Sequence, residues 1–294
     1  MYHTQEHSGS SPDFWEGNWE SLAFTESVRF CAVDPLRPLF AKYLTSGALM
    51  LEGGCGMGNY VSYYTARGFN VIGVDFAQNA LATLHVRQPH VKLCGGDVSR
   101  LPFADKTFDL YYSGGVVEHF EGGAEASLAE ACRVIKDDGV LMISVPYYSP
   151  LRKLLSPFKR DEWRIVERSQ REKADAHGGK NFFQYAYTRR EFSSMLHAAG
   201  LRVVETQGYA VLWGLYDIPF LGSNGSGEFT AKYSSSKDEK LDEIDLENLS
   251  VDPDTSLLKR LVVCEDASIP VLGLGVKFFR VAAANMMMYV CRRD

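Results

Sequence analysis

The chain contains few cysteines, and none of them forms a closely spaced pair. Its six cysteines include no Cys-x-x-Cys motif, the spacing that zinc sites commonly use. We therefore expect no metal centre and no disulfide framework. Free thiols are typical of a reducing compartment, and residues 1–20 are polar and aromatic rather than signal-like, so we expect a cytoplasmic protein.

Positive charge is also scarce. The 31 lysines and arginines are outnumbered by 37 aspartates and glutamates, which gives a net charge of −6. No block of basic residues stands out against this acidic background. Because such a chain has no long-range attraction for a polyanion, we expect no nucleic acid among its partners.

The sequence has no uninterrupted apolar run of the length that a membrane-spanning helix needs. Its longest apolar stretch, residues 269–291, is broken by Lys277, Arg280 and Asn285. We interpret this stretch as a buried helix followed by a final strand, Met286–Cys291, and expect no membrane span.

Apolar residues are nevertheless abundant. The chain has 294 residues, of which 46% are hydrophobic, enough to bury one substantial core. We expect a single domain over residues 1–294; the sequence does not indicate an oligomeric state.

The most informative segment is glycine-rich and follows an apolar strand. It reads Leu-Met-Leu-Glu-Gly-Gly-Cys-Gly-Met-Gly-Asn over residues 49–59. Glycines at 54, 56 and 58 allow a sharp turn in contact with a ligand, and the helical pattern that follows places backbone N–H groups at a helix start. Asn59 stands where a dinucleotide fingerprint needs a small residue, so the loop fits S-adenosylmethionine better than a pyrophosphate.

Two further carboxylates follow successive predicted strands. Asp75 ends the apolar segment 71–74, about twenty residues after the glycines, where a carboxylate can accept both hydroxyls of a ribose. Asp97 follows a third strand at residues 91–93. Each strand end therefore contributes one polar group to the same predicted site.

With these motifs the chain resembles the class I S-adenosylmethionine-dependent methyltransferases. It is most similar to the small-molecule branch with the signature Leu-Pro-Phe-x-Asp-x-x-Phe-Asp, present at residues 101–109, and the resemblance covers roughly residues 49–148. It implies S-adenosylmethionine as cofactor, S-adenosylhomocysteine as product and a small-molecule acceptor. The positions that match the family's cofactor contacts are Glu52, Gly53, Gly54, Cys55, Gly56, Gly58, Asp75, Phe76, Asp97, Val98, Ser113, Gly114, Gly115 and Trp19.

The order of predicted elements indicates an α/β fold. Strands and helices alternate, with a helix at 124–135 and another at 188–200 that opens on a Thr188–Glu191 capping box. Such alternation predicts a Rossmann-like, seven-stranded, mostly parallel sheet with helices on both faces and ligands at the carboxyl ends of the strands. The family's reversed last strand would be Met286–Cys291.

Three segments lie outside this pattern. We expect residues 1–45 to form cap helices, with Trp15 and Trp19 closing over the methionine end of the cofactor, although ordinary packing explains the indoles equally well. The insertions 147–187 and 213–267 would form a substrate lid. The first combines aromatic with basic and acidic residues, so it is either an acceptor-binding lid or a solvated hairpin.

Methyl transfer depends chiefly on holding the nucleophile in line with an electrophilic methyl group, and some O and N acceptors must also lose a proton. Our candidate base is His119, just beyond the fourth strand, with Glu118 orienting cofactor or acceptor; the alternative is that His119 only shapes the pocket. Tyr147, Tyr148, Tyr185 and Tyr187 are candidate walls of the acceptor site.

Two other classes of protein remain open at this stage. One is a protein that binds S-adenosylmethionine or S-adenosylhomocysteine without turnover. The other, disfavoured by Asn59 and by the 101–109 segment, is an NAD-dependent oxidoreductase.

Overall fold

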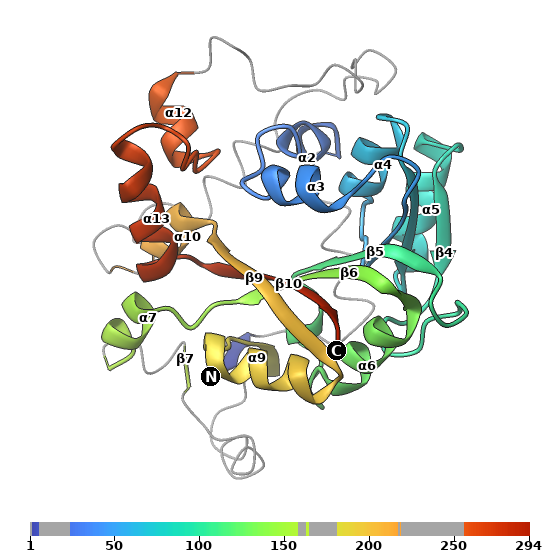
Figure 1. Cartoon of the computed structure of the whole chain (residues 1–294). Helices are drawn as coiled ribbons and strands as arrows, with labels where there is room; N and C mark the ends of the chain where they lie inside the picture. The colour runs from blue at the N-terminus through green and yellow to red at the C-terminus, as the bar shows by residue number, and fades with distance from the viewer. Residues whose placement is uncertain (1, 6–23, 158–162, 165–180, 217, 219–255) are drawn as a thin grey trace.

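The computed structural model describes residues 2–5, 24–157, 163–164, 181–216, 218 and 256–294 (Figure 1). Its centre is a seven-stranded sheet in the order β4-β3-β2-β5-β6-β10-β9. The strands are β2 (Leu49–Gly53), β3 (Asn70–Asp75), β4 (Lys92–Gly95), β5 (Phe108–Gly114), β6 (Ile135–Pro146), β9 (Leu201–Tyr209) and β10 (Met286–Arg293). Only β10 runs antiparallel to its neighbours, β6 and β9. The predicted Rossmann-like fold with a reversed last strand is confirmed.

Helices cover both faces of this sheet because successive strand residues point to opposite sides. Met50 and Leu110 pack in one core cluster, whereas the next residues, Leu51 and Tyr111, pack in the other. Figure 1 shows the two helical layers above and below the sheet. The first is α2 (Phe24–Phe30), α3 (Arg37–Tyr43), α4 (Asn59–Thr65) and α5 (Gln78–Arg87); the second includes α6 (Glu125–Val134) and α9 (Arg189–Ala198).

The strand after α6 starts earlier than the sequence indicates. The Asp-Asp-Gly sequence at 137–139 predicts a stop between the helix 124–135 and an apolar strand from Val140, but β6 already starts at Ile135, which is paired with Phe108. The register shifts before the next pair, Leu110 and Val140. Residues 136–139 therefore form an irregularity inside the strand rather than a separate stop signal.

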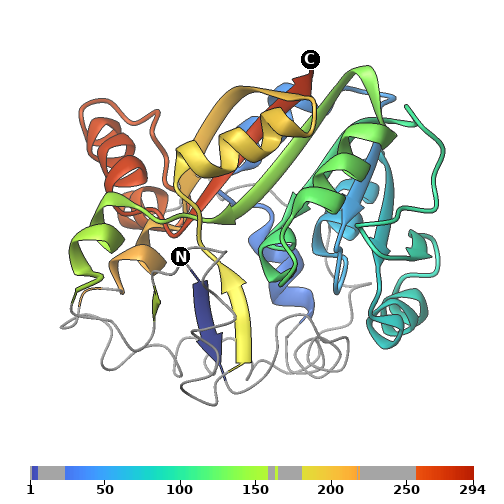
Figure 2. The ribbon, with the colours of Figure 1, turned by 90° about the horizontal axis from the view of Figure 1, so that it is seen from below.

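A second sheet, which the sequence did not predict, joins the N-terminus to the first insertion. It has three strands in the order β7-β1-β8: β1 (Tyr2–Gln5), β7 (Trp163–Arg164) and β8 (Asn181–Tyr185). Figure 2 shows β1 lying beside β8. The expected N-terminal cap therefore begins with a strand and continues in α2 and α3.

The expectation of a buried helix within residues 269–291 is wrong. The helix there is α13 (Leu272–Ala282), and only Gly273 in it is buried. It contacts α12 (Leu257–Val262) and α7 (Pro150–Leu155) at one corner of the molecule, near α10 (Val211–Leu215) (Figure 1). The apolar composition of α13 predicts burial, but most of its large side chains are exposed to solvent. No helix in the described ranges is long and apolar enough to cross a membrane.

Candidate cofactor and acceptor site

The glycine-rich turn lies between β2 and α4 and is held against β3. The N–H groups of Gly54 and Cys55 both donate to the carbonyl of Val74, at 2.8 and 3.0 Å. Gly54 has a φ of +73°, and a Cβ added there would lie 2.4 Å from Val116 Cγ2. Both the left-handed backbone and the close approach of Val116 therefore require glycine at this position.

Glu52, the acidic residue before the glycines, caps α4. Its Oε2 accepts a hydrogen bond from the backbone N–H of Val61 at 2.9 Å, and the side chain is buried. Burial, with a smaller contribution from the charge of Asp75, raises the pKa of Glu52 to about 8. Glu52 therefore already satisfies one of the N–H groups that the sequence assigned to a ligand.

Asp75 ties the glycine turn to the end of β3. Its Oδ2 accepts the N–H of Gly56 at 2.7 Å and its Oδ1 accepts the N–H of Ala77 at 2.8 Å. The carboxyl is buried, and this burial raises its pKa. Each oxygen has taken one backbone donor and has the capacity to accept another.

The third carboxylate, Asp97, lies beyond the end of β4 and is exposed to solvent. Its Oδ1 accepts the N–H of Ser99 at 2.7 Å, which fixes the turn that follows. Val98 beside it is buried, and Phe76 is half-buried after β3. These residues thus follow β3 and β4, which are adjacent parallel strands.

The end of β5 offers a small, open surface. Ser113 is buried and its hydroxyl donates to the carbonyl of Gly53 at 3.0 Å, which joins the ends of β5 and β2. Gly114 is exposed. At Gly115, with a φ of +73°, an added Cβ would meet nothing closer than Glu118 Oε1 at 3.6 Å.

His119 lies in the 3-10 turn Val117–His119, against β8 of the first insertion. Its Nδ1 is 2.9 Å from the carbonyl oxygen of Phe183, and its ring meets the Phe183 ring edge to face. Because a carbonyl only accepts, Nδ1 carries the proton in this contact. Burial lowers the pKa of His119 to about 4, so the imidazole is neutral near pH 7.

Glu118 is the most unusual carboxyl group of the site. Only 1% of its surface is exposed, and its Oε2 has no hydrogen-bond partner among the residues that the structure describes. Burial raises the pKa of Glu118 to about 8. The group is therefore mainly protonated at neutral pH and has a hydrogen bond to offer to a polar neighbour.

Three of the four candidate acceptor-wall tyrosines come together. Tyr147 and Tyr187 are paired across an isolated parallel bridge, and the rings of Tyr185 and Tyr187 are 5.8 Å apart. The Tyr185 hydroxyl donates to the carbonyl of Glu121 at 3.0 Å. Glu121 follows His119 closely in the sequence. The backbone N–H of Tyr148 donates to the Tyr187 carbonyl at 2.8 Å, whereas its ring is covered by Lys153 of α7. Trp19 and Trp15 lie outside the described residues.

Sequence reasoning missed a buried polar contact beneath the glycine turn. Asp34 accepts from the hydroxyl of Tyr60 at 2.5 Å and from the N–H of Leu36 at 2.6 Å. The Tyr60 ring packs against both Phe40 and Tyr112, with centroid distances of 5.4 and 4.7 Å. Asp34 precedes a proline, a common turn signal, but nothing in the sequence indicates that it pairs with Tyr60.

The 101–109 signature segment is held by two α6 residues that sequence reasoning also missed. The Arg133 guanidinium donates to the carbonyls of Leu101 and Phe103 at 3.1 and 2.8 Å. It also forms ion pairs with Asp105 and Glu130. Arg133 therefore fixes the loop that leads from the Asp97 turn into β5.

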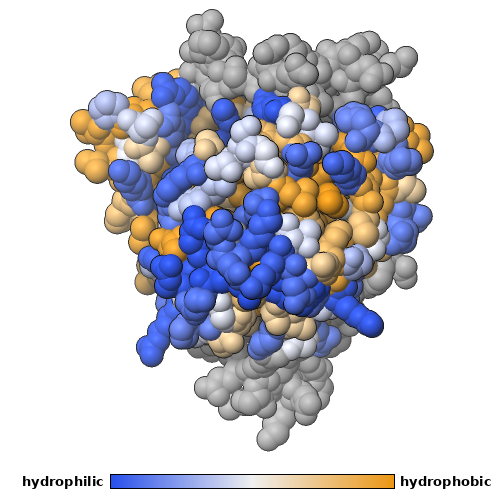
Figure 3. Space-filling view, turned by 45° about the vertical axis from the view of Figure 1, so that its right-hand side comes forward, coloured by the Kyte–Doolittle hydropathy of each residue, from blue (hydrophilic) through white to orange (hydrophobic). Residues whose placement is uncertain are grey.

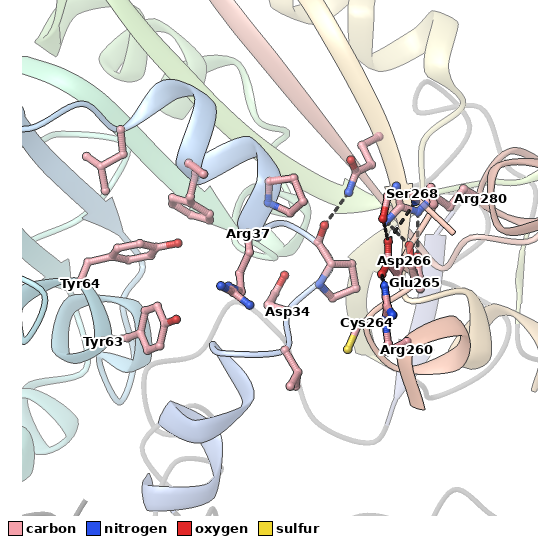
Figure 4. Close-up of a pocket in the computed structure, with 18 of the residues that line it drawn as sticks. Asp34, Arg37, Tyr63, Tyr64, Arg260, Cys264, Glu265, Asp266, Ser268 and Arg280 are labelled. Carbon is pink, nitrogen blue, oxygen red and sulfur yellow. Dashed lines mark hydrogen bonds and ion pairs between the residues drawn. The ribbon is translucent and has the colours of Figure 1, made fainter. Parts of the chain in front are cut away.

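A separate cavity of about 880 Å³ lies between α3, α4 and the segment 264–268 (Figure 4). Two ion pairs, Arg260 with Asp266 and Arg280 with Glu265, occupy one side of it. Tyr63 and Tyr64 line the other side. Among the residues that the structure describes, none of the predicted cofactor or acceptor residues lines this cavity, so it is distinct from the site at the strand ends.

No cluster of three potential metal ligands occurs among the described residues. All six cysteines are free thiols. Cys55, inside the glycine turn, is buried, and that burial raises its pKa well above the usual value. Its thiol packs as an apolar group beside β3.

Comparison with known proteins gives this site a family context. Residues 51–143 match a family model described as a methyltransferase domain. A Mycolicibacterium smegmatis protein named "Probable S-adenosylmethionine-dependent methyltransferase" is 31% identical over 42% of this chain and 49% of its own length. The malonyl-[acyl-carrier protein] O-methyltransferase of Pectobacterium atrosepticum is 30% identical over 39% and 45%, respectively. The chain thus spans just under half the length of these curated relatives.

Structural comparison agrees with the fold over a longer range. A chain of the Haloferax volcanii complex of the methyltransferase activator Trm112 is 15% identical, with a TM-score of 0.51 over 97% of this chain and 98% of that one. At this identity the likeness concerns the fold alone. The domain match and the sequence relatives imply S-adenosylmethionine as cofactor, with S-adenosylhomocysteine as its product.

Proposed function

We propose that this protein transfers a methyl group from S-adenosylmethionine to an oxygen or nitrogen atom of a small-molecule acceptor. The observation that carries the proposal is that the matched segment, residues 51–143, contains the glycine turn together with Asp75 and Asp97 at adjacent strand ends. Fold likeness alone would not identify a reaction, because one fold serves many functions.

The residues present fit this cofactor. Asp75 retains one acceptor position on each oxygen, which suits a pair of ribose hydroxyls, and exposed Asp97 suits an amino group of adenine. Val98 and Phe76 supply apolar surface next to these carboxylates. Gly115 leaves room for a contact, since an added Cβ would lie 3.6 Å from the nearest atom. This room and the Oε2 of Glu118, which has no partner in the described part of the chain, suit a polar group at the methionine end.

When bound, the cofactor supplies an electrophilic methyl group, so the protein's task is to position the acceptor and manage its proton. His119 is neutral, with its proton held on Nδ1 by the Phe183 carbonyl. In this tautomer Nε2 carries the lone pair that accepts a hydrogen bond or proton from the acceptor. Glu118, protonated near neutral pH, orients a polar group beside it.

The acceptor would lie against the tyrosines of the first insertion. Tyr147 and Tyr187 pair through their backbones, the rings of Tyr185 and Tyr187 are 5.8 Å apart, and the Tyr185 hydroxyl donates to the carbonyl of Glu121, just after the turn that carries His119. Such a wall suits a small molecule with an apolar part. In this proposal the two insertions form the lid; residues 158–162, 165–180, 217 and 219–255 of them lie outside the described part of the chain.

A methyl-transfer assay tests the proposal. The purified chain is incubated with S-adenosylmethionine and a panel of phenols, carboxylic acids and amines, and products are scored for the mass gain of one methyl group. We expect S-adenosylhomocysteine to form together with one methylated acceptor. Binding of S-adenosylmethionine without any methylated product would favour the cofactor-binding protein, and saturable NAD binding would favour the oxidoreductase.

A further inference from the structure

The corner of the molecule formed by α7, α12 and α13 exposes an unusual amount of apolar surface. Leu258, Leu274 and Phe278 leave 71%, 69% and 65% of their surfaces exposed. We call this surface the apolar corner. Its exposed large side chains are Leu154, Leu257, Leu258, Leu274, Phe278 and Val281. The helices are contiguous, since α13 contacts both α12 and α7 (Figure 1).

These side chains face outward because α13 is held by its other side. A Cβ at Gly208 in β9 would lie 2.1 Å from the Arg280 carbonyl oxygen, so the helix backbone lies directly on the strand. Arg280 donates to the Glu265 carbonyl at 2.9 Å and pairs with the Glu265 carboxylate at 3.2 Å. Leu274, Phe278 and Val281, at a spacing of four and three, then form one exposed stripe.

The charge of these helices is opposite to that of the chain. The whole protein has a net charge of −6. In contrast, α7, α12 and α13 contain no aspartate or glutamate, and each contains two basic residues, as their sequences PLRKLL, LLKRLV and LGLGVKFFRVA show. Lys153, Lys259 and Lys277 are exposed. The structure shows no ion pair for these three lysines in the parts of the chain that it describes.

Helices that lie in the surface of a membrane typically combine an apolar stripe with lysines along its border. A protein of net negative charge is repelled from anionic lipids unless a local positive face opposes that repulsion. The longest of the three helices, α13, has 11 residues, about 16 Å at 1.5 Å per residue, so it can lie on a bilayer but not cross it.

Hydrophilic side chains gather at the lower centre of the face shown in Figure 3, so that part of the surface has no apolar cluster like the apolar corner. Single exposed apolar residues occur elsewhere, such as Val86 on α5 with 82% of its surface exposed. Val86 has no apolar partners of this kind around it on α5, and isolated exposed side chains are ordinary. Val86 is therefore no counterpart to the apolar corner, where exposed apolar side chains and lysines lie on helices that contact one another.

We propose that the apolar corner docks the protein on the surface of an anionic lipid membrane. Leu274, Phe278 and Val281 enter the headgroup region together with the leucines of α7 and α12, while the three lysines contact lipid phosphates. This docking would place the acceptor wall near the lipid. Arg152 on α7 donates to the Tyr147 carbonyl at 2.9 Å and to the carbonyl of Asn285, just after α13, at 3.2 Å.

Co-sedimentation of the full chain with vesicles tests this inference independently of methyl transfer. The probes are phosphatidylcholine vesicles with and without phosphatidylglycerol, at low and high sodium chloride. We expect binding to the vesicles that contain phosphatidylglycerol, weakened by salt because screening reduces the attraction between lysines and lipid phosphates. L274Q/F278Q should bind at least about tenfold more weakly, since two large apolar side chains no longer leave water.

The matched controls separate lipid docking from other causes. V86Q, an equally exposed apolar-to-polar change on α5, should bind like the wild type, and K259Q/K277Q should lose the preference for phosphatidylglycerol. Thermal melting checks that each variant is folded, and titration with S-adenosylmethionine checks the proposed function separately.

The inference is overturned if the wild type does not sediment with phosphatidylglycerol vesicles or if L274Q/F278Q binds them as well as the wild type does. It is also overturned if light scattering without lipid shows a dimer that this double variant disperses. The occupant of the apolar corner would then be a second copy of the chain.

Discussion

His119 is the residue whose protonation state most affects the proposed reaction. Its burial and its contact with the Phe183 carbonyl keep it neutral with the proton on Nδ1. A base of such low pKa is present in its active form throughout the neutral range, but its affinity for a proton is modest. Positioning of the acceptor therefore remains the larger part of catalysis in this account.

Replacing His119 by alanine should lower kcat for a phenol or amine acceptor by about 10²-fold, because the group that accepts the proton is lost. The affinity for S-adenosylmethionine should not change. Since the pKa of His119 is about 4, the wild-type rate should show no inflection near pH 6.5 from this group. Steady-state kinetics between pH 6 and 9 check both expectations.

The exposed His85 is the control, and H85A should leave the rate unchanged. If H119A turns over at the wild-type rate across this pH range, His119 does not act as a base.

Glu118 makes stability depend on pH. Its pKa is about 8 in the folded protein against 4.5 for an ordinary glutamate, so the folded state binds the proton more tightly. The free energy of unfolding that this group contributes is fully present below pH 4.5 and is lost as the pH rises towards 8, at up to ~1.4 kcal/mol per pH unit.

Urea unfolding at pH 5, 6, 7 and 8 should therefore show a shallower loss of stability for E118Q than for the wild type. Glutamine keeps the shape of the side chain but does not titrate. Glu52, with a similar pKa, is retained in both proteins and does not affect the difference. Parallel curves for the two proteins would show that Glu118 is ionised in the folded state.

The turn between β2 and α4 is the element on which cofactor binding depends. Changing Gly54 to alanine would strain a φ of +73° and place a methyl group 2.4 Å from Val116. Gly68 has nearly the same φ, +79°, but an added Cβ there meets nothing within 4 Å. G68A therefore reproduces the backbone strain, worth roughly 1 kcal/mol, away from the site.

We expect G68A to lower stability slightly and to keep wild-type affinity for S-adenosylmethionine. G54A should lower stability further and weaken that affinity at least tenfold, because the turn must move to accommodate the methyl group. Thermal melting and titration calorimetry measure the two effects. Equal affinities for G54A and G68A would mean that the turn does not contact the cofactor.

The loop before β5 depends on α6 through Arg133. R133A would remove the donors to the Leu101 and Phe103 carbonyls and unpair Asp105 and Glu130. We expect a loss of roughly 1–3 kcal/mol in the free energy of unfolding, since these are charge-assisted hydrogen bonds. Denaturant unfolding compares R133A with R190A, an exposed arginine on α9. A loss no larger than that of R190A would show that the loop does not need Arg133.

Elements encoded by neighbouring residues were predicted well. The capping box of Thr188 and Glu191 is present as expected, because both hydrogen bonds lie within one helical turn. The strand bounds around the glycine turn also agree within one or two residues. Contacts between distant segments were not predictable in this way: β1 pairs with β8, and Phe183 meets His119, through partners that no local pattern identifies.

The helix α13 shows a different limit of sequence reasoning. Its composition predicted burial, but hydrophobic periodicity gives only the face of a helix and not what that face meets. In the folded chain one side of α13 packs against Gly208 of β9 and forms the ion pair between Arg280 and Glu265. The apolar stripe on its other side is exposed to solvent. The mostly parallel character of the sheet, in contrast, followed from the alternation of strands and helices.

The molecule as a whole should be stabilised by its cofactor through mass action. A ligand that binds only the folded state adds about 2.7 kcal/mol at a concentration of one hundred times its Kd, which raises Tm by roughly 4–5 °C for a chain of 294 residues. S-adenosylhomocysteine should act in the same way. The same concentration of NAD should leave Tm unchanged.

Titration calorimetry of the purified chain with S-adenosylmethionine tests the central claim most directly. The account predicts one saturable site per chain, competition by S-adenosylhomocysteine, and a large loss of affinity in D75N, whose amide offers one acceptor atom where the carboxylate offers two. An absence of saturable binding, or full affinity in D75N, would contradict it.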